Sequence, residues 1–395
     1  MSINKTSIEG KPFVTLLFVI LYLSFISVSS LFAVDVGLVL DQNAEYSGSG
    51  DDTAFSYTGI AIPRVTGLLG DTGDFYISAG FSYKNDPWSV VPELLRTDLS
   101  WRSGNMEFTI GRMAYNDPLG YVASGLFDGG RAVFDTDIGS FSAGAWYTGF
   151  LYKRRANIEM TENELTANNT ALDYGDFANS YFAPRRILAA IDWEHKGLFD
   201  MAIVRLSLLG QFDLTQEKLN SQYLAGKATL PYGAFSLDLG GCFELIETNN
   251  DIGSAFAAES AFAWRNPAHY LSLGAKYSSG GSDTLAAFLP LTTNTQGRIL
   301  KPKLSGITMI TLDYTARLHE TFSIGLYPAY FMLNDSDSAG KRMLGGEIFA
   351  ALYWSPAPDI SVNLGGGAYL PSLGNFAPDE KSYWRAELNL VLSLF

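Results

Sequence analysis

The chain is 395 residues long and acidic, with 27 basic and 41 acidic side chains and a formal charge of −14 at pH 7. Nucleic-acid phosphates would repel such a chain, which argues against a nucleic-acid partner, and the single Cys242 excludes an internal disulfide. The abundance of Gly (39), Phe (26) and Tyr (21) favours strands joined by turns.

The N-terminus carries an export signal in residues 1–33. Lys5 and Lys11 precede a run of about twenty apolar residues that closes in small residues up to Ala33, the pattern of a cleaved signal peptide. The run is also long enough to span a bilayer, so an uncleaved anchor is the alternative. Removal of residues 1–33 takes away two Lys and one Glu and moves the formal charge from −14 to −15.

Residues 34–395 are predicted to form one domain built of strands. No later stretch approaches about eighteen uninterrupted apolar residues, so a membrane crossing would need strands. Ile310 and Leu312, for example, alternate with Thr311 and Asp313, as a strand with one apolar face requires. We count about eighteen such segments, near residues 34–46, 53–67, 74–84, 93–102, 105–115, 128–138, 141–152, 184–195, 199–214, 219–230, 234–246, 252–264, 269–279, 306–318, 321–333, 342–354, 359–370 and 382–395.

The connections between these segments alternate in length. Counted back from the C-terminus, long connections alternate with short turns, and residues 153–183 and 280–305 are very long. Long loops on one rim and tight turns on the other are typical of outer-membrane barrels. We therefore predict an all-β fold, a closed transmembrane antiparallel β-barrel of about 18 strands (16 to 20), with both termini on the periplasmic, short-turn side. Both very long loops are expected to face the outside, and one of them or residues 115–127 to fold into the pore.

Four tryptophans support this arrangement. Each stands shortly before a predicted turn and in phase with the apolar face of its strand. Indole rings prefer the boundary between lipid and water, so we expect an aromatic girdle at one membrane interface. Its members are Trp101, Trp193, Trp264 and Trp354.

The last segment resembles the C-terminal assembly signal of bacterial outer-membrane barrels. Leu388, Leu390, Leu392 and Leu394 share one face and the chain ends in Phe395, although Phe395 is out of phase with them. The resemblance implies a Gram-negative-type outer membrane, with its lipid and the barrel assembly machinery as partners. In lipid the last strand must bond to the first, because every backbone group needs a partner.

A segment in the first half of the chain resembles alginate-export-type porins, an eighteen-stranded family. The match covers Gly111-Arg112 at the end of one strand and Phe127 to Arg131 at the start of the next. The resemblance implies that Arg112 and Arg131 line the pore and that the loop 115–127 folds inward. Arg112 is in phase with the apolar Phe108 and Ile110, so this role needs a bulge near Gly111.

Charged side chains opposite the apolar faces are expected to line the lumen. A wall that separates basic from acidic residues would order passing solutes by charge. The alternative is that these charges pair with one another and only keep the interior polar. The basic arc is predicted to hold Arg96, Asp98, Arg102, Arg131, Arg186 and Arg205, and the rest of the wall Asp238, Glu244, Glu259, Arg317 and Glu347.

These features predict passive diffusion of small hydrophilic solutes, anionic or saccharide-like, with no cofactor, metal or catalytic site. The three histidines, His195, His269 and His319, all fall at predicted turns, and Gly365 to Gly367 lack the lysine of a phosphate loop. Two other classes stay open, a hydrophobic-substrate outer-membrane transporter and a secreted soluble β protein. The sequence leaves the choice between monomer and trimer open.

Overall fold

The computed structural model describes residues 34–395 except 51, 86–87, 199–200, 216–218, 249–250, 282–284, 294, 336–339, 376–380 and 395. The predicted signal peptide, residues 1–33, and the terminal Phe395 lie outside the described residues.

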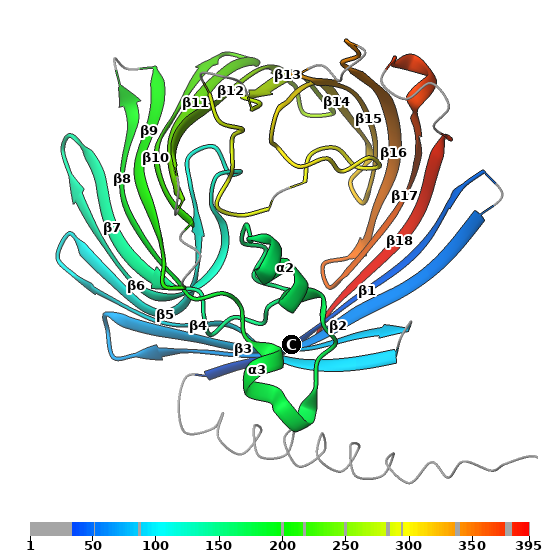
Figure 1. The fold of residues 1–395 in the computed structure, drawn as a ribbon. Coiled ribbons are helices and arrows are strands. Elements are labelled where there is room, and N and C mark those ends of the chain that lie inside the picture. Colours follow the sequence, from blue (N-terminus) through cyan, green and yellow to red (C-terminus); the bar gives the residue numbers. More distant parts are fainter. Residues whose placement is uncertain are drawn as a thin grey trace, which may run out of the picture.

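Eighteen antiparallel strands form one closed sheet (Figure 1). Each strand pairs with its neighbours in sequence, and β1 pairs with β18 from Leu38↔Leu394 to Ser49↔Tyr383. The predicted closed 18-stranded barrel is therefore confirmed. The strands are β1 (Val34–Ser49), β2 (Asp52–Leu69), β3 (Gly73–Asn85), β4 (Trp88–Ser103), β5 (Met106–Asn116), β6 (Ser124–Thr136), β7 (Gly139–Tyr147), β8 (Arg186–Leu198), β9 (Ala202–Asp213), β10 (Leu219–Tyr232), β11 (Phe235–Thr248), β12 (Ile252–Arg265), β13 (His269–Ser278), β14 (Ile307–His319), β15 (Phe322–Leu333), β16 (Met343–Ala357), β17 (Ile360–Leu370) and β18 (Tyr383–Leu394).

The two rims of the barrel differ in their connections. One rim, the turn rim, has only tight turns, and Gly104 and Gly233 occupy two of them at φ +60°, a conformation that glycine adopts without strain. The opposite rim, the loop rim, carries residues 117–123, 148–185 and 279–306. The longest of these contains α2 (Glu162–Asn169), η1 (Tyr174–Asp176) and α3 (Phe177–Tyr181), and η2 (Pro371–Leu373) precedes β18.

Side chains alternate between the two faces of the wall. Ile191 and Leu208 are register partners on the outer face, 60% and 56% exposed. The next pair, Asp192 and Ser207, points inward, where both accept or share hydrogen bonds with the Tyr115 hydroxyl. An apolar outside and a polar inside suit a barrel that stands in lipid and encloses water.

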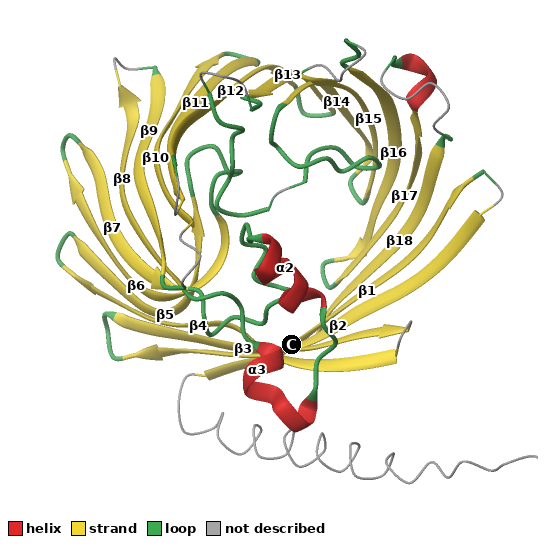
Figure 2. Cartoon of the chain, in the orientation of Figure 1, coloured by secondary structure: helices red, strands yellow, loops and turns green. Residues whose placement is uncertain are grey.

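The three long connections of the loop rim fold into the barrel (Figure 2). They also bond to one another, because Thr292 N–H donates to the Val122 carbonyl at 3.0 Å and Ile158 forms a bridge with Thr292. Their apolar residues pack with the inner wall into a core that includes Leu119, Val122, Leu291 and Leu304. The sequence predicts that one loop folds inward, whereas all three do.

Within the described ranges, no helix is both long and apolar enough to cross a membrane.

Candidate functional site: the lumen and its three loops

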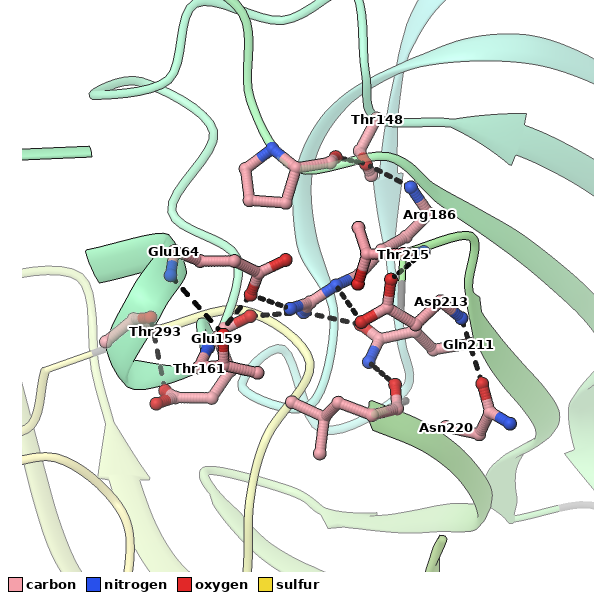
Figure 3. Close-up of polar contacts among 12 residues, drawn as sticks. Thr148, Glu159, Thr161, Glu164, Arg186, Gln211, Asp213, Thr215, Asn220 and Thr293 are labelled. Atoms are coloured by element: carbon pink, nitrogen blue, oxygen red, sulfur yellow. Dashed lines mark hydrogen bonds and ion pairs between the residues drawn. The ribbon is translucent and has the colours of Figure 1, made fainter. Parts of the chain in front are cut away.

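Arg186 at the start of β8 anchors the loop 148–185 (Figure 3). The Arg186 side chain is fully buried, and its guanidinium donates to Glu164 at 2.6 Å and to the Glu159 carbonyl, with Asp213 at 3.9 Å behind it. Glu164 also belongs to the capping box of α2, because it accepts from the N–H of Thr161 at 2.8 Å. Arg186 therefore holds the N-terminus of α2 against the wall and is not open to the lumen, contrary to the predicted pore-lining role.

Glu347 on β16 anchors the loop 279–306 from the other side of the barrel. Its carboxylate accepts from three consecutive backbone N–H groups, those of Arg298, Ile299 and Leu300, at 2.6, 3.0 and 2.9 Å. Arg385 on β18 donates to the carbonyl of Arg298 at 2.5 Å. Glu347 is 4% exposed, so it too supports a loop and is closed off from the lumen.

Glu244 on β11 makes a smaller contact with the same loop. It accepts from the Leu289 N–H at 2.8 Å and is fully buried. Like Arg186 and Glu347, it was predicted from its inward phase to line the pore. The phase is correct, but a loop covers the side chain.

Asp117 folds the shortest of the three loops. Its carboxylate accepts from the backbone N–H groups of Leu119, Gly120, Val122 and Ala123. Burial raises the pKa of this carboxyl, and the four hydrogen bonds to the charged form oppose that rise. One side chain thus satisfies the turn that carries residues 117–123 into the barrel.

Three of the predicted arginines lie on the inner face, and two of them pair directly with carboxylates. Arg96 pairs with Asp98 and Arg205 with Glu194 at 2.9 Å, and the side chains of both arginines are 50% exposed. Arg131 donates to Ser142, which in turn donates to Asp192 at 2.8 Å. In the pairs that Arg96 and Arg205 make, the carboxylate is the more buried partner and the guanidinium the more exposed one. The inner wall therefore has both features: its charges pair, and basic groups still face the lumen.

The remaining predicted residues lie on other parts of the wall. Arg102 pairs with Glu107 at the turn rim and is exposed, and Arg317 is exposed near the same rim at the end of β14. Glu259 accepts from Lys227 at 2.8 Å, and Asp238 is half-buried on β11.

Arg112 does not line the lumen. Trp146 on β7 is buried and points inward, so the next residue, Tyr147, points outward. Tyr147 is the register partner of Asp128, and Asp128 is the register partner of Arg112, so all three share one face. Arg112 therefore belongs to the outward row, as its phase with Phe108 and Ile110 indicated. Gly111 does adopt an unusual conformation, with φ +119°, but it does not turn Arg112 inward.

The four tryptophans lie near the ends of strands that run to the turn rim. Each is the register partner of a phenylalanine on a neighbouring strand: Trp101↔Phe108, Trp193↔Phe141, Trp264↔Phe235 and Trp354↔Phe322. Trp101 and Trp354 are 37% and 48% exposed on the outer face.

Several lumen residues were missed from the sequence. Lys303 pairs with Glu159 at 2.9 Å, and both border a cavity of about 170 Å³ between the two long loops. These residues lie in loops, where no period shows which way a side chain points. Lys276 on β13, which donates to Gln296 at 3.1 Å, is in phase with the inward Ser272 and could have been found from the alternation.

In the part of the chain that the structure describes, no group of three or more His, Cys, Asp or Glu side chains could hold a metal ion.

Comparison with known proteins places the fold. No protein-family model matches the chain, and no curated protein matches its sequence. Solved structures do match. OccK2 (OpdF) of Pseudomonas aeruginosa in complex with glucuronate gives a TM-score of 0.65 at 14% identity, over 91% of this chain and 98% of that one. OccAB4 of Acinetobacter baumannii gives a TM-score of 0.63 at 11% identity over 91% and 97%. OpdK of Pseudomonas aeruginosa gives 0.60 at 13% identity over 91% and 98%. The resemblance to alginate-export-type porins finds no support among these matches, and the fold of the chain is that of the Occ and Opd outer-membrane porins.

Proposed function

We propose that the protein is an outer-membrane channel for passive diffusion of small hydrophilic solutes, with a bias toward anionic or saccharide-like ones. The observation that carries the proposal is the barrel itself: an apolar outer wall, a charged inner wall, and three loops that narrow the lumen from one rim. Its long loops would face outside and its termini the periplasm, after removal of residues 1–33 as a signal peptide.

The neighbours support the proposed solute class. OccK2 was solved with glucuronate and OpdK with vanillate, which are both carboxylates. The half-exposed guanidinium groups of Arg96 and Arg205 offer several donors in a fixed fork, a geometry that suits carboxylate oxygens. Because each arginine already has an acidic neighbour, its contact with a solute is weak, which lets the solute leave as readily as it enters.

A measurement of ion selectivity tests this function. In a planar bilayer with a salt gradient, replacement of Arg96, Arg131 and Arg205 by Ala should shift the reversal potential toward cation preference, because Asp98, Asp192 and Glu194 keep their charge. The matched control is Arg265→Ala, which removes one arginine at the turn-rim end of β12. Absence of any conductance from the folded protein would refute the channel, and an unchanged reversal potential in the triple variant would refute the arginine path.

A further inference from the structure

The barrel wall has a gap between β4 and β5 on the side of the loop rim. The two strands pair only from Ser103↔Met106 at the turn rim up to Thr97↔Arg112. Above that point β4 continues to Trp88 bonded to β3 alone, and β5 continues to Asn116 bonded to β6 alone. We call this gap the seam, bounded by residues 88–96 of β4 and 113–116 of β5.

Local backbone features produce the seam. The register of β4 against β3 shifts at Leu95 and Arg96, which marks a bulge just above the last β5 pair. Gly111, at φ +119°, lets β5 approach β4 so closely that a Cβ there would lie 2.1 Å from the Thr97 carbonyl oxygen. Pro92 sits within the open edge, where a missing N–H is an advantage.

Side chains replace the missing backbone ladder. The carbonyl of Val90 accepts from the Tyr174 hydroxyl, that of Pro92 from the Tyr181 hydroxyl, and that of Leu94 from Arg112. Tyr174 and Tyr181 belong to the loop 148–185, whose α3 lies beside β3 and β4 in Figure 1. The seam is therefore closed by side chains, which can move aside without breaking a backbone ladder.

The same loop passes from the outside of the wall to the inside at this point. Outside, Phe150 is 60% exposed, packs on the outward Tyr147, and its carbonyl accepts from Arg112 at 3.0 Å. Inside, Arg155 bonds to Glu93 at 2.9 Å and to Ser82, both on the inner face of the wall.

Exposed aromatic side chains of the loop 148–185 lie beside the seam. Tyr174 is 63% exposed, Phe182 40% and Phe177 38%, and the rings of Phe177 and Phe182 pack on Tyr181 in the seam itself. The inner end is basic, because the Arg155 side chain is 49% exposed whereas its partner Glu93 is 3% exposed. A solute that crossed here would meet an apolar surface at one end and an accessible guanidinium at the other.

We propose that the seam is a lateral passage between the lumen and the surrounding lipid, closed here by the loop 148–185, for solutes with an apolar chain and an anionic head. The proposal rests on the proposed function in that it requires the barrel to stand in a membrane. The head group would bind at Arg155 and the chain would leave past Tyr181 toward Phe150 and Phe182. Hydrophilic solutes would still cross along the barrel axis.

A reversible cross-link tests the passage. Leu94 and Phe150 both bond through their carbonyls to the guanidinium of Arg112, so cysteines at these two exposed positions lie close enough for a short bis-methanethiosulfonate linker. The variant Leu94→Cys, Phe150→Cys is made after Cys242→Ser and reconstituted into liposomes. Flux of decanesulfonate, which stays charged and does not cross lipid as a neutral acid, is compared with flux of ethanesulfonate before cross-linking, after it, and after reduction of the linker.

The cross-link should lower decanesulfonate flux at least about tenfold, with recovery on reduction, and leave ethanesulfonate flux and ion conductance within about twofold. Equal decanesulfonate flux in the open and linked states, or none in the unlinked protein while ethanesulfonate passes, would overturn the lateral passage alone. If neither solute passes and no conductance is seen, the channel function itself fails. The single-cysteine variants treated with the same reagent control for simple modification.

Discussion

The two longest loops are held inside the barrel by opposite chemistry. The loop 148–185 offers one carbonyl and one carboxylate to the buried guanidinium of Arg186 on β8. The loop 279–306 offers backbone N–H groups to the buried carboxylate of Glu347 on β16. These two buried charges are therefore loop anchors, whereas the half-exposed Arg96 and Arg205 are candidates for solute contact.

The two anchors also differ in the groups that they bind, and so in the cost of losing each one. Arg186 acts through side chains and one carbonyl and lies over a second buried carboxylate, Asp213. Glu347 acts on backbone groups alone. Loss of a buried charge that neutralises other buried charges costs more than loss of an acceptor for amides.

The largest expected effect is at Arg186. Arg186→Met removes the guanidinium that pairs with Glu164 and Asp213 and should destabilise the folded barrel by about 3 to 5 kcal/mol, while freeing α2 to widen the pore. A lower temperature for the heat-induced shift in gel migration and a larger single-channel conductance would show this. Arg186→Lys keeps the charge without the fork and should fall between Met and the native protein. A stable Met variant of unchanged conductance would contradict the anchor.

Glu347 should have the next largest effect. Glu347→Ala leaves three N–H groups of the loop 279–306 without their acceptor, at a cost of about 2 to 3 kcal/mol. We expect faster protease cleavage within this loop and noisier channel openings, with a smaller effect on the loop 148–185, which bonds to it but keeps its own anchor at Arg186. Glu347→Gln retains an acceptor oxygen and serves as the matched control. Equal cleavage of both loops would show that the anchors are not independent.

Glu244 should have the smallest effect of the three. Its carboxylate accepts from one backbone group of the same loop, Leu289 N–H, so Glu244→Gln should cost about 1 kcal/mol or less. Hydrogen exchange at Leu289 should quicken in Glu244→Ala and stay near the native rate in Glu244→Gln. A Gln variant as labile as Glu347→Ala would mean that charge, and not acceptor geometry, holds the loop.

The wall could be predicted from the sequence because each strand repeats the same physical contrast between lipid and interior. Leu388 and Leu394 on β18, for instance, reach the outer face as their alternation requires. The same period correctly put Arg112 on the outward row, and only the resemblance to another family pointed it inward. The predicted segment 93–102 begins after Pro92, whereas β4 begins at Trp88, because a proline is tolerated where no neighbouring strand needs its N–H.

The site could be predicted only in part. Alternation gives the face of a side chain but not whether a loop from far along the chain covers that face. Arg186 and Arg205 both have the inward phase of their strands. Residues 159–164 cover Arg186, whereas Arg205 is half-exposed. The sequence indicates the seam only through Pro92 and Gly111. Whether two strands pair depends on the paths of both, and the sequence of one strand does not show this.

The pairing of β1 with β18 bears on how the barrel is made. Asn389 donates to Asp41 across this junction, a contact between residues 348 positions apart. A contact between distant residues forms only after the chain has lost the entropy of closing a very long loop. The barrel should therefore fold slowly, and the pairing of β1 with β18 should form last. Until then β1 and β18 would both be bare edges, able to pair with strands of other molecules. A chain that loses β18 should therefore aggregate or be degraded before it yields a smaller barrel.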